Sequence, residues 1–275
     1  MSIASHSIPF GLIVLIFLLV LPASAYAGFR LGHYELRRAP ERYAGGKLPG
    51  ESSLGALLAL LGLLVGFTFS ATLGWREASV SAVVEEGAAL GTAFLRADLL
   101  PDGAGRPLQE ALLSYARTRI TPSGFHATRA NVDAVLAQTV AAQALLWPAT
   151  MAAITPDTPA PVATFVAGGI TEVLDAHTRR VAAASKTITS GIWVLLTFAA
   201  GSGLFIIGNR AALQGRSMSW RTLVFSLVLA AVLVTIEDLS RATDGFTVVP
   251  QVALINAVAD MEAALGVEPA PKAQP

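Results

Sequence analysis

The chain lacks cysteine and is poor in charge. None of its 275 residues is cysteine, and only 14% are charged. The missing thiols exclude disulfides, thiolate nucleophiles and sulfur-ligated metals, although a cysteine-free chain can occur in either redox compartment. Soluble domains carry about 25% charged residues. The shortage of charge, together with a mean hydropathy of +0.59, therefore indicates a membrane protein.

A surplus of positive charge and recognisable catalytic motifs are also missing. Nineteen basic residues balance nineteen acidic ones, so we expect no nucleic acid partner. No nucleophile elbow, phosphate loop, zinc-protease helix or dinucleotide fingerprint occurs. The histidines, at positions 6, 33, 126 and 177, lack the spacing of metal ligands. His177 lies on an apolar stripe of the helix expected from Pro159, where a buried histidine of a bundle is the ordinary explanation. We therefore expect no enzyme activity, catalytic residue, cofactor or metal site.

Long apolar runs are present, and they predict an all-α polytopic membrane protein. A bilayer core about 30 Å thick needs roughly 20 apolar residues in a helix, because hydrocarbon cannot satisfy backbone hydrogen bonds. Four stretches meet this requirement and lack Asp, Glu and Lys in their apolar cores: Ile8–Phe29, Leu54–Trp75, Ile188–Gly208 and Trp220–Ile236. The sequence thus predicts four transmembrane helices.

The first stretch has a second interpretation. Small residues at Ala23, Ala25 and Ala27 are typical of cleavage sites that follow a signal-peptide core. However, the residues before this stretch contain no Lys or Arg, whereas Arg30 and Arg37 follow it. That charge asymmetry favours an uncleaved helix, and cleavage stays as the alternative.

Basic residues also predict the sidedness. Both short loops are basic: the first carries Arg30, Arg37, Arg38, Arg42 and Lys47, and the loop from Asn209 to Ser219 carries Arg210 and Arg216. Positive short loops stay in the cytoplasm. We therefore expect a multi-pass protein of a cell inner membrane, with both termini and the large loop outside the cytoplasm.

The sequence of the large loop between the second and third crossings predicts a helical bundle. No breaker interrupts the helix that starts at Leu54 until about Leu99, so the second crossing should continue beyond the membrane. Helices over 107–120, 128–154 and from Pro159 towards the third crossing should pack on it, with a kink at Pro148. This divides the chain into 1–75 and 188–242 in the membrane, a bundle at 76–187 and a C-terminal segment at 243–275 that is disordered beyond Val267.

Small residues form one face of the second crossing. Gly62, Gly66 and Ser70 follow each other at steps of four, which lets another backbone approach closely. We predict that this face packs against another helix of the chain, and self-association is the alternative. A homo-oligomer would use the second arrangement.

Polar residues on the same helix form a second row. Thr68, Thr72 and Arg76 lie on one side, and a row of hydroxyls that leads to an arginine can line an anion path. Alternatively, each hydroxyl bonds its own helix and Arg76 reaches towards headgroups. Both interpretations stay open at this point.

Charged residues beyond the crossings suggest a polar network at the outer boundary. Glu85 and Glu86 are adjacent, Arg96 and Asp98 follow on the same helix, and Glu237, Asp238 and Arg241 close the fourth crossing. Neighbouring carboxylates can share a proton or bind a cation, although solvated acids and simple ion pairs are the ordinary alternatives. Acids at a helix C-terminus require compensation by a positive charge.

Several segments resemble a bacterial membrane family of unknown function that is called bestrophin-like. The similar segments are Gly-Phe-Thr-Phe-Ser at 66–70, 83–101, Ile-Glu-Asp-Leu-Ser-Arg at 236–241, Gly245, 248–251 and Gly-Phe-Arg-Leu-Gly at 28–32. The chain departs from the family at Gly87-Ala88, where Ala-Asn is expected. The resemblance implies the same four-helix plan and, by analogy with bestrophins, an oligomeric anion channel.

Two functions follow as hypotheses. The first is a homo-oligomeric ion channel or transport-type protein that passes a small anion. The second is a membrane-anchored extracytoplasmic sensor or scaffold, which would need a partner protein because the cytoplasmic loops are too short for an output domain. The sequence assigns neither the ligand nor the number of subunits.

Overall fold

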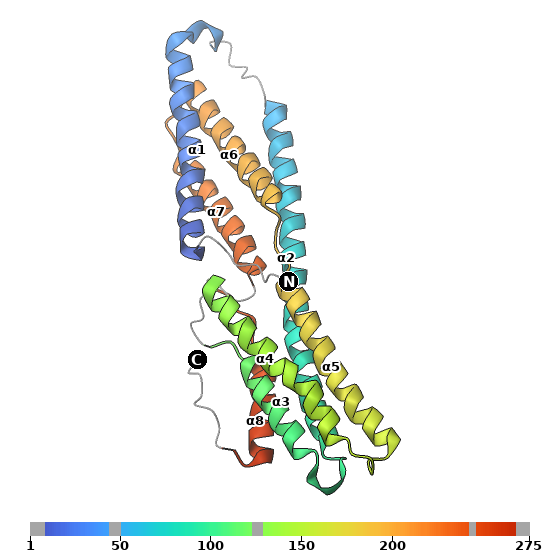
Figure 1. Cartoon of the computed structure of the whole chain (residues 1–275). Coiled ribbons are helices and arrows are strands. Elements are labelled where there is room, and N and C mark those ends of the chain that lie inside the picture. Colours follow the sequence, from blue (N-terminus) through green and yellow to red (C-terminus); the bar gives the residue numbers. More distant parts are fainter. Residues whose placement is uncertain (1–8, 44–50, 123–128, 242–245, 268–275) are drawn as a thin grey trace. The chain divides into compact units, whose positions relative to one another are not determined.

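The computed structural model describes residues 9–43, 51–122, 129–241 and 246–267, and in these residues the chain is all-α. Eight α helices follow one another (Figure 1). Their bounds are α1 Phe10–Arg38, α2 Glu51–Ala97, α3 Arg106–Thr118, α4 Arg129–Ala153, α5 Ala160–Ala184, α6 Ser190–Leu213, α7 Trp220–Ser240 and α8 Val252–Leu265. Two short 3₁₀ turns occupy Pro40–Arg42 and Pro101–Gly103.

Five of these helices are long and apolar enough to cross a membrane. They are α1, α2, α4, α6 and α7. Four of them overlap the stretches that the sequence predicts to cross, and α4 is the additional one. The helix α4 has the lowest hydropathy of the five, so length and composition alone do not separate it from a bundle helix.

The helix α2 is the longest element. Its 47 residues form one helix, as the lack of a breaker predicts, and span about 70 Å at 1.5 Å per residue. Its charge is uneven: between Glu51 and Arg76 there is no charged residue, whereas Glu77, Glu85 and Glu86 follow. The half beyond Trp75 is therefore too polar and too distant along the helix to belong to the same apolar stretch.

The chain divides into two compact units. One unit contains Trp75–Lys186 and the segment from Arg241 onwards, and the other contains Ile8–Gly74 and Thr187–Ser240. We call the first the bundle unit and the second the apolar unit. The first half of α2, with α1, α6 and α7, belongs to the apolar unit, and the remaining helices belong to the bundle unit.

Close backbone contacts hold the apolar unit together. The helices α1 and α6 pack side by side, and α7 contacts both (Figure 1). A methyl group added to Gly28 would overlap the carbonyl group of Phe205, and one added to Gly208 would overlap that of Ala25. Only glycine lets the two backbones approach this closely, so these positions fix the α1–α6 contact.

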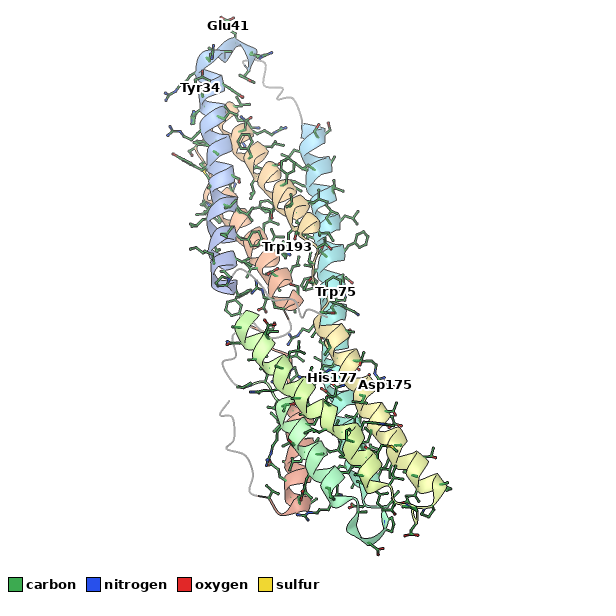
Figure 2. All side chains as sticks on the ribbon, in the orientation of Figure 1. Tyr34, Glu41, Trp75, Asp175, His177 and Trp193 are labelled. Carbon is green, nitrogen blue, oxygen red and sulfur yellow. The ribbon has the colours of Figure 1, made fainter. Side chains whose placement is uncertain are left out.

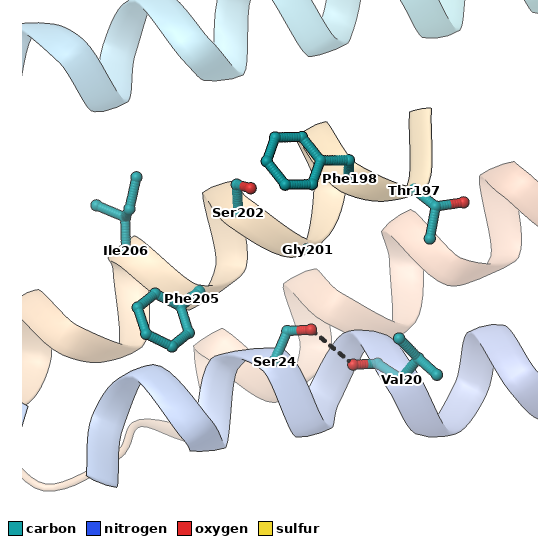
Figure 3. A pocket seen from close by; sticks show the side chains of 8 residues that line it. All are labelled: Val20, Ser24, Thr197, Phe198, Gly201, Ser202, Phe205 and Ile206. Carbon is teal, nitrogen blue, oxygen red and sulfur yellow. Dashed lines mark hydrogen bonds between the residues drawn. The ribbon is translucent and has the colours of Figure 1, made fainter. Parts of the chain in front are cut away.

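A shallow groove runs between α1 and α6 in the apolar unit (Figure 3). Its volume is about 490 Å³, and its wall contains Val20 and Ser24 of α1 and part of α6, including Thr197, Gly201 and Ser202. The Ser24 hydroxyl donates to the Val20 carbonyl oxygen at 2.9 Å. The groove thus combines apolar walls with a few small hydroxyl groups.

The bundle unit has a continuous hydrophobic core. It is built by residues of the second half of α2 and of α3, α4, α5 and α8, among them Leu90, Leu112, Leu146, Ile170 and Leu254. The helix α8 lies close to α2, because a methyl group on Gly87 would stand 3.0 Å from the carbonyl oxygen of Ala253. Gly266 then ends α8 with a left-handed backbone, φ +66°, which glycine adopts without strain.

Some predicted boundaries differ from the structure. The helix expected from Pro159 towards the third crossing ends at Ala184, and α6 begins separately at Ser190, because 185–189 break the hydrogen-bond ladder. The helix α4 includes Pro148, as its predicted range does, and the expected kink at this residue stays a prediction. The predicted disorder after Val267 lies outside the described residues.

Candidate functional site

The most fully formed polar site among the described residues surrounds Glu86 in the bundle unit. Glu86 lies on α2, beyond the apolar stretch that ends at Trp75, and its side chain is completely buried. Two arginines, a tyrosine and a histidine from α3, α5 and the residue that follows α3 face it. Figure 2 shows His177, one of the four, on α5. We call these five residues the Glu86 cluster.

Short charge-assisted contacts hold the carboxylate. Arg119 Nε donates to Glu86 Oε1 at 2.7 Å, and Arg180 Nη1 donates to Oε2 at 2.6 Å. The Tyr115 hydroxyl donates to Oε1 at a longer 3.4 Å. Arg180 also donates to the backbone carbonyl of Arg119 at 3.2 Å, so the two arginines are fixed relative to each other.

His177 stands near the carboxylate without bonding to it. Its Nδ1 atom lies 3.8 Å from Glu86 Oε1, which is beyond hydrogen-bond distance. This buried nitrogen has no hydrogen-bond partner among the described residues. The ring also packs edge-on against Tyr115, with ring centroids 6.3 Å apart. His177 therefore lies beside Glu86 and packs against Tyr115.

The surroundings keep Glu86 ionised. Burial raises the pKa of the carboxyl group, but His177 and the charges of Arg119 and Arg180 outweigh burial and lower the pKa from 4.5 to about 2. Burial lowers the pKa of Arg180, and the charge of Glu86 opposes that effect. Burial and the charge of Glu86 both raise the pKa of Tyr115, which keeps its phenol neutral. At neutral pH Glu86 is thus a fixed anion and not a proton donor.

Helical spacing brings the cluster together. Tyr115 and Arg119 are four residues apart at the end of α3, and His177 and Arg180 are three residues apart on α5, so each pair shares one helix face. The carboxylate of Glu86 and the guanidinium groups of Arg119 and Arg180 together carry a net charge of +1. The chemistry that this arrangement supports is a rigid ionic clamp between α2, α5 and the end of α3.

The other predicted polar residues of α2 have separate partners. Glu85 is exposed, and Arg179 Nε donates to it at 3.2 Å. Arg96 pairs with Glu172 at 3.3 Å, and its guanidinium lies 4.2 Å from the centre of the Phe165 ring. Asp98 accepts a hydrogen bond from Gln109 at 2.7 Å. Glu85, Glu86, Arg96 and Asp98 therefore do not pair with one another.

The row of Thr68, Thr72 and Arg76 is hydrogen-bonded to backbone. Thr68 donates to the Leu64 carbonyl at 2.7 Å, and the buried Thr72 donates to the carbonyls of Thr68 and Phe69. Arg76 donates to the carbonyls of Thr247 at 2.7 Å and Val248 at 3.1 Å within the bundle unit. The hydroxyl protons thus have the partners that the second interpretation of this row expects.

The small-residue face of α2 is open. Gly62, Gly66 and Ser70 are exposed, and no atom lies within 4 Å of a methyl group built on either glycine. The predicted close packing inside the chain is therefore not seen at these two glycines. The close glycine contacts of the apolar unit are at Gly28, Gly32 and Gly208.

The acids at the end of α7 are buried. Glu237 and Asp238 lie in its last turn, and Arg241 directly follows the helix with only 1% of its surface exposed. All three have interactions with other groups. The prediction that acids at this helix end are compensated is consistent with that burial, because an isolated charge is costly to bury.

Sequence reasoning found one member of the cluster as a site residue and missed three. Glu86 was expected in a polar network, and the spacing of α5 placed His177 on its apolar face, whereas Tyr115, Arg119 and Arg180 were not singled out. Two arginines near the ends of otherwise amphipathic helices were a usable signal. Their partner, however, is 33 and 94 residues away in sequence, and local patterns do not encode such distances.

Comparison with known proteins gave no match. No family model, curated protein or solved structure matches the chain. The resemblance of 66–70, 83–101 and 236–241 to bestrophin-like membrane proteins therefore stays a prediction.

Proposed function

We propose that the chain is a multi-pass inner-membrane protein in which α1, the first half of α2, α6 and α7 cross the bilayer. In this proposal α4 stays in the bundle. The helices α3 and α5 both pack on α4, and they carry Arg106, Glu110, Glu172 and Arg180. Hydrocarbon around α4 would have to accommodate these charged neighbours as well, which is unfavourable.

The bundle would lie outside the cytoplasm. Arg42 follows α1 and Arg216 occupies the loop from Gln214 to Ser219, and positively charged short loops remain on the cytoplasmic side. The ends of the first half of α2 and of α7 then emerge on the opposite side together with the bundle. Both termini belong to that side.

In this arrangement the protein is a membrane-anchored sensor or scaffold whose bundle controls the membrane helices. The observation that carries the proposal is the clamp between Glu86 of α2 and Arg180 of α5. The helix α2 continues without interruption into the apolar unit, and α5 is followed by α6 after only the residues 185–189. A ligand or partner that loosens the clamp would change two connections to the membrane at once.

Spin labels in the apolar unit test this control. Because the chain contains no cysteine, pairs of labels can be placed at exposed Gly11 of α1 and Ala71 of α2. We expect Glu86→Gln to shift or broaden the label-to-label distance distribution in proteoliposomes. The matched control Glu110→Gln removes an exposed pair with Arg106 in the same unit and should leave the distribution unchanged.

The outcome against this proposal is equally defined. If Glu86→Gln loosens the bundle, seen as a lower melting temperature, while the distance distribution stays that of the wild type, then the bundle does not control the membrane helices. A sensor needs a partner protein to transmit its signal. A protein that binds the wild type with higher affinity than it binds Glu86→Gln would be such a partner.

A homo-oligomeric anion channel is the second candidate. It is favoured by the open face of Gly62 and Gly66, which leaves room for a second copy, and by the row that ends at Arg76. Anions bind to hydrogen-bond donors, and the protons of Thr68 and Thr72 are already donated to helix carbonyls. Conduction along this row therefore requires the hydroxyls to rotate.

Chloride flux in proteoliposomes tests the second candidate. A channel predicts flux above that of protein-free liposomes and a reduction in Thr72→Val, which keeps the shape of the side chain but removes the hydroxyl. Thr235→Val is the matched control, because Thr235 also bonds its own helix but lies on α7. An absence of flux in a correctly folded oligomer would reject the channel.

A further inference from the structure

The charges of the apolar unit are segregated to its two ends. Contacts of Gly28 with Phe205 and of Gly32 with Asn209 show that α1 and α6 run parallel, so their C-terminal ends lie together with the start of α7. Seven arginines occupy this end, at positions 30, 37, 38, 42, 210, 216 and 221, against the acids Glu35, Glu41 and Glu51. We call it the arginine end. The other end of α7 carries Glu237 and Asp238.

Most of these arginines are exposed and have no acidic partner. Within the described residues, no carboxylate lies within ion-pair distance of Arg30, Arg37, Arg38, Arg42, Arg216 or Arg221. In the bundle unit, by contrast, Arg96, Arg106, Arg117, Arg119, Arg179 and Arg180 each pair with a glutamate. These six arginines therefore present positive charge that no carboxylate of the described residues neutralises.

Aromatic side chains lie beside two of these arginines, Arg38 and Arg221. Arg38 donates to the Tyr34 hydroxyl at 2.7 Å, and Arg221 lies 5.9 Å from the centre of the Trp220 ring. Figure 2 shows Tyr34 on α1 and Glu41 beyond its end. Tyrosine and tryptophan favour the boundary between lipid tails and headgroups, which places these arginines at the depth of lipid phosphates.

We propose that the arginine end is a binding surface for anionic phospholipid headgroups. Guanidinium groups bind phosphate oxygens in a bidentate manner, and basic residues near a membrane surface attract anionic lipids. The arginines are distributed over the ends of three apolar helices, as a surface for several headgroups requires. The negative end of a helix dipole favours basic residues in the last turns of α1 and α6, but Arg42, Arg216 and Arg221 lie outside those turns.

This inference rests on the proposed membrane crossing and not on control by the bundle. Failure of the crossing would appear first as failure to insert into nanodiscs. Failure of bundle control would leave lipid binding unchanged. The two proposals can therefore be rejected separately.

Energy transfer between the protein and labelled lipids tests the inference. A donor fluorophore on a single cysteine at exposed Ser217 would report acceptors on the acyl chains of phosphatidylglycerol or phosphatidylcholine in otherwise phosphatidylcholine nanodiscs. We expect stronger transfer from phosphatidylglycerol. The double variant Arg37→Gln/Arg38→Gln should reduce that preference by up to about fivefold for each arginine, since each basic residue contributes about a factor of five in affinity.

The matched control is Arg106→Gln/Arg179→Gln, which removes two exposed arginines from the bundle unit and should leave the preference intact. Arg216→Gln, in the loop after α6, provides a single change in case the double variant does not fold. Equal transfer from both lipids, or an equal loss in the control, would overturn the inference. Displacement of phosphatidylglycerol by millimolar inorganic phosphate would instead identify a site for free phosphate and also overturn it.

Discussion

Glu86 is stable as a buried anion only because its partners are buried with it. Arg119 and Arg180 supply two charge-assisted bonds, and Glu86 is the carboxylate that both of them contact. Burial of such a group costs several kcal/mol, which the ionic contacts offset only when the geometry is complete. Removal of the anion would leave two guanidinium groups with small exposed fractions and no countercharge.

We predict that Glu86→Gln destabilises the bundle unit strongly. Breaking a buried ion pair costs about 3–5 kcal/mol, which corresponds to a decrease in melting temperature of roughly 10 °C for a unit of this size. Circular dichroism of the purified protein in mild detergent measures the change. Glu110→Gln, which removes an exposed pair, should change the melting temperature by no more than about 2 °C. Equal effects of both variants would contradict the clamp.

We also predict that acid removes the contribution of Glu86. Its pKa is about 2 in the folded protein, against about 4.3 in an unfolded chain. Burial raises the folded pKa, but His177, Arg119 and Arg180 lower it by more than burial raises it. Because the folded pKa is the lower one, the stabilisation is complete above about pH 4.5 and disappears as the pH falls towards 2. It amounts to roughly 3 kcal/mol.

The melting-temperature difference between the wild type and Glu86→Gln measures this pH dependence. The difference should be constant from pH 7 to pH 5 and decrease at pH 4 and pH 3. The other carboxylates are the same in both proteins, so their contributions cancel in the comparison. A difference that stays constant down to pH 3 would show that Glu86 is protonated in neither state or in both.

Single residues also show where sequence reasoning stops. The apolar spacing on α5 correctly placed His177 on a buried face. The same pattern does not predict the burial of Arg180, three residues later, because an arginine at the margin of an apolar face is usually solvated. Its burial follows from the position of Glu86 on a different helix, and only the fold supplies that position.

At the level of helices, glycine decides which surfaces meet. The helices α1 and α6 contact each other through Gly28 and Gly208, where no side chain fits, whereas Gly62 and Gly66 of α2 have open space. The prediction rested on the regular spacing of small residues on α2, although Gly28 and Gly32 of α1 have the same spacing and do make close contacts. A pattern of small residues therefore indicated that close helix contacts occur but not which helix makes them.

We predict opposite effects of alanine at these two kinds of glycine. Gly208→Ala should lower the melting temperature in detergent by several degrees, because the new methyl group overlaps the Ala25 carbonyl and separates α1 from α6. Gly66→Ala should be neutral or stabilise by up to about 1 kcal/mol through helix propensity. A strong destabilisation by Gly66→Ala would instead reveal a contact with another copy at that face.

Helices were more predictable than their packing. The unbroken run from Leu54 to Leu99 predicted α2, and the positions of Pro107 and Pro159 predicted where α3 and α5 begin, each within one residue. Periodicity and proline act locally, so the sequence shows them directly. The helix α8 was not predicted, although Leu254, Val258, Met261 and Leu265 follow at helical spacing.

At the scale of the whole molecule, hydropathy alone allows either four or five membrane crossings. The helix α4 satisfies the length and composition of a crossing. Its neighbours decide against that role in our proposal, because α3 and α5 pack on it and carry charges in the same unit. The two arrangements place the same segments differently. With four crossings, α3 and the loop before α5 lie on the same side of the membrane, whereas a crossing by α4 puts them on opposite sides.

Cysteine accessibility distinguishes these arrangements directly, since the natural chain has no cysteine to interfere. Exposed positions suit the purpose: Ser114 on α3, Asp157 before α5 and Ser217 between α6 and α7. We predict that a membrane-impermeant maleimide added to intact spheroplasts labels Ser114→Cys and Asp157→Cys but labels Ser217→Cys only after lysis. Opposite labelling of the first two would establish α4 as a fifth crossing. Labelling of Ser217→Cys alone would invert the sidedness, because arginine-rich loops would then lie outside the cytoplasm.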